Sequence, residues 1–174
     1  MPDPVTLTPT SYVVLGLVAE CEPVTSYEMK QLVAISIGYF WSFPHSQLYA
    51  EPARLVDAGL LDEDVEPSGR KRRRYRITAS GRAVLTTWLA EPTTEPAELR
   101  DLGLLKLFFA AHTSDADRRT LAKSQAAAHD ARRAEYERLW AHVSPNCDRW
   151  QLATLEMGLR YERAVAAFWH ELAE

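Results

Sequence analysis

The sequence predicts a mostly α-helical protein in which one two-stranded β-hairpin separates short helices from long ones. Three observations support this fold class. Apolar residues recur every three or four positions through most of the chain, which is typical of amphipathic helices. The turn residues Pro67, Ser68 and Gly69 stand between two short segments with strand character. After the linker-like TTEPAE at 93–98, the sequence becomes rich in alanine and charge.

Two capped helices are expected first. Thr8 can cap a helix whose first residue is Pro9, where the missing N–H costs nothing, and Pro23 ends that segment. Thr25 and Glu28 fit a capping box at the start of the second helix, which we expect to end at Gly38. The buried faces are predicted to consist of Val13, Val14, Leu17, Val18, Met29, Leu32 and Val33.

A third helix begins near Ser46 and ends at Gly59, a natural left-handed terminator. Pro52 lacks an N–H and clashes with the preceding turn, so it predicts a kink or a distorted first half. The hairpin follows, with strands 61–65 and 73–78, and then a helix capped by Thr78 and ended by Pro92. This is the order of a winged helix-turn-helix domain over residues 1–92, with the hairpin as its wing.

Residues 93–174 form the second predicted domain. A short apolar helix (98–113) precedes a long helix capped by Ser114, and Ser144 with Pro145 starts another long helix. Such an αα-hairpin has too little apolar partner surface within its own chain, which predicts a homodimer. The expected dimer interface consists of Leu107, Phe108, Trp150, Leu155, Leu159, Val165, Phe168, Trp169 and Leu172.

A strongly basic run, RKRRRYR, occupies residues 70–76 of a chain whose formal net charge is −4. No acidic residue occurs between Pro67 and Ala90. A basic run can simply be solvated, but on a wing it favours contact with DNA phosphates, because cations release condensed counterions. Strand alternation predicts Arg72, Arg74 and Arg76 on one face and Arg73 on the other, so only a subset would touch DNA.

The start of the third helix is the expected recognition segment. Gln47 can pair with adenine in the major groove, and the hydroxyls of Ser46 and Tyr49 can bind phosphate. Tyr49 and Leu55 lie on different helix faces, which favours an exposed Tyr49 over a buried one. The full predicted DNA-binding set is Tyr27, Lys30, Ser46, Gln47, Tyr49, Arg54, Arg70, Lys71, Arg72, Arg73, Arg74 and Arg76.

Other function classes find no support in the sequence. No apolar stretch approaches the roughly 20 residues that cross a bilayer, so we expect a cytoplasmic protein with no membrane partner. Cys21 and Cys147 are far apart and predict reduced thiols rather than a disulfide or zinc site. HExxH, GxSxG and Gly-rich phosphate loops do not occur, so we expect no enzyme, cofactor or metal.

The chain resembles the PadR family of transcriptional regulators over nearly its whole length. The segments that carry the resemblance are LGLVAECEPVTSYEMKQL, FWSFPHSQLYAEPARLVDAGLL and SGRKRRRYRITASGRAVLTTWL. The matching positions are Tyr27, Trp41, Gln47, Tyr49, Leu55, Gly59, Leu60, Tyr75, Thr78 and Gly81. VTSY precedes the second helix where many members have a His-Gly pair, and Pro52 stands where many have leucine. The resemblance implies a double-stranded DNA partner and a C-terminal domain that mediates dimerisation.

Regulators of this family also respond to small aromatic compounds. The resemblance therefore raises Trp140, Trp150 and Trp169 as candidate effector residues, although plain interface packing explains them equally well. Two competing classes stay open: a winged helix that binds an acidic protein partner, and a multidrug-binding protein without specific DNA readout. The salt dependence of duplex binding separates the first class from a DNA-binding regulator.

Overall fold

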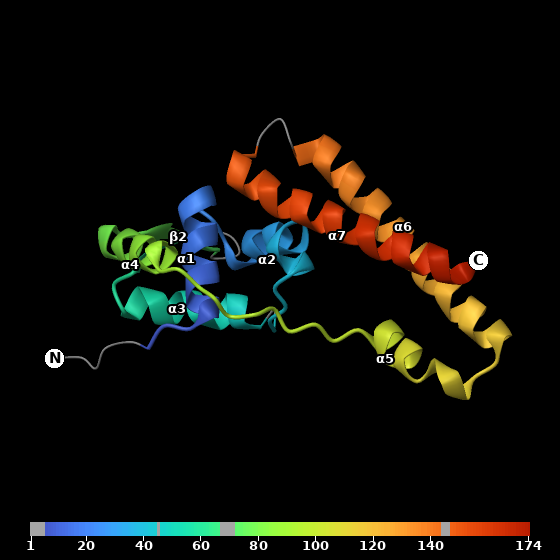
Figure 1. Ribbon diagram of the computed structural model, residues 1–174. Helices are drawn as coiled ribbons and strands as arrows, with labels where there is room; N and C mark the ends of the chain where they lie inside the picture. The colour runs from blue at the N-terminus through green and yellow to red at the C-terminus, as the bar shows by residue number, and fades with distance from the viewer. Residues whose placement is uncertain (1–5, 45, 67–71, 144–146) are drawn as a thin grey trace. The chain divides into compact units, whose positions relative to one another are not determined.

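The computed structural model of the protein describes residues 6–44, 46–66, 72–143 and 147–174. It divides into two compact units, Met1–Glu95 and Pro96–Glu174 (Figure 1). The sequence predicted the boundary at residues 92/93.

The first unit begins with two capped helices, α1 (Pro9–Cys21) and α2 (Ser26–Ala34). The backbone N–H of Thr8 donates to Ser11 Oγ at 2.9 Å, and Pro9 is the first helical residue, as predicted. The capping box of α2 is confirmed: Thr25 N–H donates to Glu28 Oε2 at 2.8 Å, and Glu28 N–H donates to Thr25 Oγ1 at 3.2 Å. The prediction that Gly38 ends this helix is wrong. The helix ends at Ala34, and a 3-10 turn, η1 (Ile37–Tyr39), follows.

Helix α3 (Gln47–Asp57) runs through Pro52 without interruption, and the Pro52 ring is buried. The missing N–H deprives the Leu48 carbonyl of its helical partner, yet the helix continues on both sides. Leu48, Pro52 and Leu55 share the buried face, so packing of this face holds the helix where propensity disfavours it. Gly59 follows with φ +70°, the left-handed conformation expected of a helix terminator.

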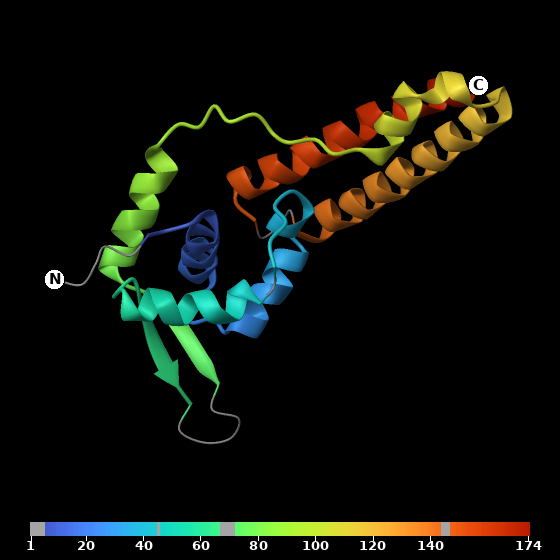
Figure 2. The same ribbon diagram turned by 90° about the horizontal axis from the view of Figure 1, so that it is seen from below.

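The hairpin consists of antiparallel strands β1 (Leu61–Val65) and β2 (Arg73–Ile77), with Leu61 opposite Ile77 and Val65 opposite Arg73. A single bridge joins Val24 to Tyr75 at the other edge of β2. Leu61, Tyr75 and Ile77 are buried and fix one hairpin face on the helices. Figure 2 shows the rest of the hairpin projecting away from the helices as a wing.

Helix α4 (Ala79–Ala90) closes the unit and is capped by Thr78, whose Oγ1 accepts from Gly81 N–H at 3.0 Å. A Cβ at Gly81 would lie 2.2 Å from the carbonyl oxygen of Leu60, so only glycine allows this close approach. The core of the unit is made of Val14, Leu15, Val18, Val24, Met29, Val33, Leu48, Leu55, Leu60, Leu61, Tyr75 and Ile77.

The second unit contains α5 (Leu102–Phe108), a 3-10 turn η2 (Ala110–His112), and the long helices α6 (Asp115–Val143) and α7 (Arg149–Ala173). Ser114 caps α6 as predicted, since its Oγ accepts from Asp117 N–H at 3.2 Å. The predicted start of the last helix is wrong. Asp148 caps α7 by accepting from the N–H groups of Trp150 and Gln151, while Ser144 and Pro145 lie outside the described residues.

Helices α6 and α7 pack along each other as an αα-hairpin around a small core of Ala122, Ala126 and Trp169. Alanines on α6 leave room for the Trp169 indole, which is fully buried. No helix among the described residues is long and apolar enough to cross a membrane.

Candidate nucleic-acid interface

A row of polar and aromatic side chains is exposed along α2 and the start of α3. Tyr27 is 61% exposed and Tyr49 is 51% exposed, and Lys30, Ser46 and Gln47 are also exposed. Leu55 is fully buried, so the opposite orientations of Tyr49 and Leu55 agree with their spacing. The apolar face of α3 anchors the helix, and its polar N-terminal residues are left accessible.

Gln47 is held in place by a contact within the unit. The hydroxyl of Thr10 donates to Gln47 Oε1 at 2.7 Å, which leaves the amide N–H groups of Gln47 as donors. The Tyr27 hydroxyl accepts from Gln31 Nε2 at 3.3 Å and still has its own proton to donate. Both side chains therefore present hydrogen-bonding groups to a partner.

Arg54 does not belong to this exposed row. Its guanidinium donates to Glu51 at 2.6 Å, to the Thr6 carbonyl at 2.9 Å and to Ser11 Oγ at 2.9 Å. These bonds tie α3 to the start of α1. Most of its donors are engaged inside the unit, and the DNA contact predicted for Arg54 stays a prediction.

The wing places acidic residues directly against the basic run. Asp62 lies opposite Arg76 and Asp64 opposite Arg74, and Glu66 N–H donates to the Arg72 carbonyl at 3.0 Å, which continues the register. Strand alternation puts all six of these side chains on one face, as predicted for the arginines. Arg73 lies on the other face, where it pairs with Glu63 at 3.1 Å. Arg70 and Lys71 lie outside the described residues.

The sequence analysis did not predict that acids pair with these arginines, because it considered only the acid-free segment after Pro67. The signal was present in LDEDVE, residues 61–66, because an antiparallel hairpin folds this strand back onto the arginines. Opposed partners in the register have position numbers that sum to a constant, so antiparallel pairing of the two predicted strands sets acids against arginines.

The N-terminus of α2 lies within electrostatic reach of the wing. Hydrogen bonds from Thr25 hold the pKa of Glu28 below its ordinary value, and the positive charges of Arg74 and Arg72 lower it further. Glu28 is therefore a carboxylate at neutral pH. It adds another negative charge near the wing arginines.

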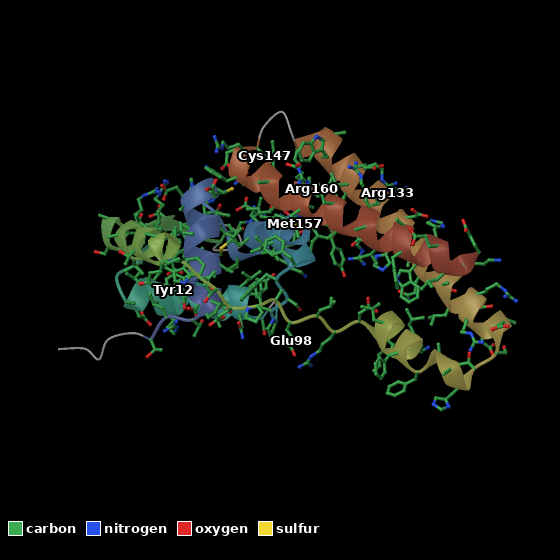
Figure 3. The ribbon with its side chains drawn as sticks, in the orientation of Figure 1. Tyr12, Glu98, Arg133, Cys147, Met157 and Arg160 are labelled. Carbon is green, nitrogen blue, oxygen red and sulfur yellow. The ribbon has the colours of Figure 1, made fainter. Side chains whose placement is uncertain are left out.

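The predicted dimer residues fall into three groups by exposure. Phe108, Trp150, Phe168 and Leu172 are exposed, and Phe108 is 82% exposed. Trp169 and Leu159 are buried in the hairpin of their own chain, which corrects their assignment to an interface with a partner. Leu107, Leu155 and Val165 are half-buried. Exposed apolar residues that the sequence analysis missed include Leu102, Leu105, Phe109 and Met157, the last of which is labelled on α7 in Figure 3.

The three candidate effector tryptophans do not share one site. Trp140 lines a groove of about 530 Å³ between α6 and α7 with Glu137, Glu156, Leu159, Arg160 and Arg163. Trp150 is exposed, with the Arg149 guanidinium 4.1 Å from its ring, and Trp169 lies in the hairpin core. Trp169 is thereby corrected as an effector residue, since its indole is not accessible.

A second groove in the first unit was not expected. Tyr12 of α1 and Trp88 of α4 stack with ring centroids 4.4 Å apart. They line a groove of about 280 Å³ together with Ala83, Val84, Thr87 and Glu91. Among the described residues, no group of histidine, cysteine, aspartate or glutamate side chains could hold a metal ion.

Two family models match the chain, one to each unit. The model described as the transcriptional regulator PadR-like family matches residues 14–87, and the model described as virulence activator alpha C-term matches residues 99–174. The first match covers α2, α3 and the wing. The second covers the long helical hairpin.

Curated relatives and solved structures agree with these matches. The negative transcriptional regulator PadR of Bacillus subtilis is 30% identical over 140 residues, which cover 77% of this chain and 76% of that protein. The probable transcriptional regulator Rv1176c of Mycobacterium tuberculosis is 39% identical over 82 residues, 44% of this chain and 42% of that protein.

The fold is shared with solved members of the same group. The structure of Bacillus subtilis PadR in complex with operator DNA superposes with a TM-score of 0.85 at 22% identity, covering 97% of this chain and 98% of that one. The PadR-like regulator BC1756 of Bacillus cereus gives a TM-score of 0.81 at 20% identity, with 93% and 94% covered. With a winged helix-turn-helix unit, a helical C-terminal unit and these relatives, the chain belongs to the PadR-like family of transcriptional regulators.

Proposed function

We propose that this regulator binds double-stranded DNA sequence-specifically, as a homodimer on a pseudo-palindromic operator, and represses transcription there. The proposal rests on the accessible start of α3. Gln47 and Tyr49 are exposed while Leu48, Pro52 and Leu55 anchor the helix, so polar groups are presented from a fixed backbone. A helix held in this way suits the major groove, where a Gln amide can pair with an adenine edge.

Contacts to the DNA backbone would come from Tyr27, Lys30 and Ser46 and from the wing arginines. Phosphate contacts fix register and orientation but carry no sequence information by themselves. Gln47 therefore reads bases in this proposal, and the other residues position it. The comparison with a curated negative regulator supports repression as the sign of control.

Dimerisation is proposed through the C-terminal helices. Phe108, Trp150, Phe168 and Leu172 are large apolar side chains that the second unit leaves exposed, and an interface with a second copy would cover them. A symmetric dimer carries two α3 helices, which predicts half-sites about 34 Å apart or a multiple of that spacing.

An aromatic effector is proposed at the groove beside Trp140. An indole next to Arg160 and Arg163 offers a flat surface and two guanidinium groups, which pair with Glu156 and Glu137 of the same groove. An aromatic ring that bears a carboxylate would bind here by taking the place of one of these acids. Bacillus subtilis PadR has been solved with p-coumaric acid, a ligand of this chemical class. Such a ligand changes regulation only if it binds the DNA-competent and DNA-free states with different affinity.

Selection from a randomised duplex pool tests the function directly. The full-length protein is incubated with the pool at two salt concentrations, and the bound duplexes are sequenced. We expect enrichment of two half-sites related by two-fold symmetry that persists at the higher salt. Binding without sequence enrichment would contradict specific readout. Absence of binding at any salt would favour the protein-interaction alternative.

A further inference from the structure

The solvent face of the wing is a ladder of opposed charges. Asp62 faces Arg76, Asp64 faces Arg74 and Glu66 faces Arg72, so each directly opposed pair on this face joins an acid to an arginine. We call the acids Asp62, Asp64 and Glu66 the acidic ladder. Three carboxylates against three guanidinium groups leave this face without net charge.

Two ion pairs run diagonally across the ladder. Arg76 Nε lies 3.4 Å from Asp64 Oδ2, and Arg74 Nε lies 3.7 Å from Glu66 Oε1. In both pairs the arginine reaches the acid one step nearer the wing tip than its opposed residue. Diagonal neighbours on a strand pair are within reach of such long side chains. Both pairs are solvent-exposed, so they add little to stability.

We infer that the acidic ladder limits how strongly the wing binds DNA of any sequence. The inference rests on the proposed DNA-binding function. A phosphate that approaches Arg74 or Arg76 competes with a carboxylate that already holds the guanidinium. The same carboxylates repel nearby phosphates, since they lie well within a Debye length of about 8 Å at physiological salt.

The wing therefore has fewer arginines free to bind phosphate than its sequence contains. Binding of any duplex by phosphate contact alone depends on how many counterions the protein releases. The ladder keeps this sequence-independent contribution small. Recognition is then left to α3, and the basic run adds affinity only when the wing docks closely enough to exchange carboxylate for phosphate.

The test is the double variant Asp64→Asn/Glu66→Gln in the full-length protein. Both changes remove charge without changing side-chain size, at exposed positions. Glu63 is left intact because it is largely buried beside Tyr75. The matched control is Glu98→Gln/Asp115→Asn, which removes two exposed carboxylates paired with Arg100 and Arg118 in the C-terminal unit. Both variants change the net charge by the same amount.

Affinity for a scrambled duplex is measured at several salt concentrations. We expect the ladder variant to bind roughly 2- to 30-fold more tightly than wild type, the factor that corresponds to two exposed ion pairs. Its slope of log K against log salt should steepen by about 1–2, since each further phosphate contact adds about 0.9. The control should match wild type, and unfolding temperatures should confirm that all three proteins are folded.

The outcomes separate the inference from the function on which it rests. Wild-type affinity and slope in the ladder variant, or weaker binding, would overturn the inference and leave specific DNA binding intact. An equal gain in the control would also overturn it, because net charge would then explain the effect. A wild-type protein that binds no duplex at any salt would overturn the proposed function itself, and the ladder's role with it.

Discussion

His129 Nδ1 on α6 and Glu162 Oε2 on α7 lie 2.6 Å apart inside the helical hairpin. Glu162 is only 5% exposed, and His129 is largely covered. Tyr136 is buried nearby, and its pKa is raised by this burial, with the Glu162 charge contributing and Arg132 opposing. A buried carboxylate needs such a hydrogen-bond partner, and this pair joins α6 to α7.

His129→Ala should destabilise the protein by roughly 1–3 kcal/mol, because it leaves the Glu162 carboxylate buried without its partner. Urea unfolding followed by circular dichroism measures the change. His142→Ala is the matched control, since His142 is exposed in the last turn of α6. Equal stability of the two variants would show that the buried pair contributes no more than a solvent-exposed histidine does.

Thr25→Ala should cost about 1 kcal/mol by removing the hydroxyl that accepts from Glu28 N–H at the start of α2. Thermal unfolding provides the measurement. Thr93→Ala serves as control because Thr93 lies outside any helix. If both threonines could be replaced at no cost, the capping box would not stabilise the first unit.

The Glu28 half of the same capping box predicts a pH dependence. The folded pKa of Glu28 is depressed, mainly by hydrogen bonds from Thr25, so its stabilising contribution is present above the unfolded pKa. The contribution is lost as the pH falls through the folded value. The stability difference between wild type and Glu28→Gln should therefore be constant near pH 7 and shrink below about pH 4.3. Unfolding at a series of pH values tests this, and a difference that grows in acid would contradict it.

Arg54→Ala should lower stability by roughly 1–2 kcal/mol through removal of the bonds to Glu51, Thr6 and Ser11. Lys30→Ala, at an exposed position on α2, should leave stability unchanged. Below the unfolding temperature, Arg54→Ala should keep the wild-type salt slope for DNA, since its guanidinium is used within the unit. A reduced salt slope in Arg54→Ala would show that Arg54 contacts a DNA phosphate.

Phe168→Glu/Leu172→Glu should convert the proposed dimer to a monomer, because charges would then have to be buried in an apolar interface. Light scattering at micromolar concentration gives the mass. Glu171→Lys changes an exposed charge between the two positions and should stay dimeric. A double variant that is helical and still dimeric would place the interface elsewhere.

Local signals predicted much of the fold. Thr25, Thr78 and Ser114 cap their helices through their hydroxyls as their residue types indicate, and Thr8 stands at the N-cap position of α1. The strand bounds at Leu61–Val65 agree with the alternating pattern. Each of these features depends on a few neighbouring residues. Sequence-based prediction works well where the determining contacts are local.

Features that depend on packing were not predicted. Pro52 predicted a kink or a distorted first half, but its ring lies in the buried face of α3 and the helix runs through it. Trp169 and Phe168 are adjacent and equally apolar, and only the packing of α6 on α7 decides that Trp169 is buried and Phe168 exposed. Arg54 looked like a basic recognition residue because its partners, Thr6 and Ser11, are more than 40 positions away.

In the proposed complex Gln47 reads a base edge, and parallel titrations of an operator and a scrambled duplex test this contact most directly. Wild type, Gln47→Ala and Arg72→Ala/Arg74→Ala are compared over a series of salt concentrations, with dimer state and unfolding temperature checked. Gln47→Ala should lose roughly 1–3 kcal/mol on the operator and little on the scrambled duplex, with an unchanged salt slope.

The arginine variant should behave differently. It should weaken binding to both duplexes by a similar factor and reduce the salt slope by about 1 for each arginine that no longer touches a phosphate. We therefore expect Gln47→Ala to lose affinity for the operator only. The arginine variant should lose affinity for both duplexes and show a weaker dependence on salt. Equal losses on both duplexes for Gln47→Ala, or wild-type binding by the arginine variant on both, would contradict it.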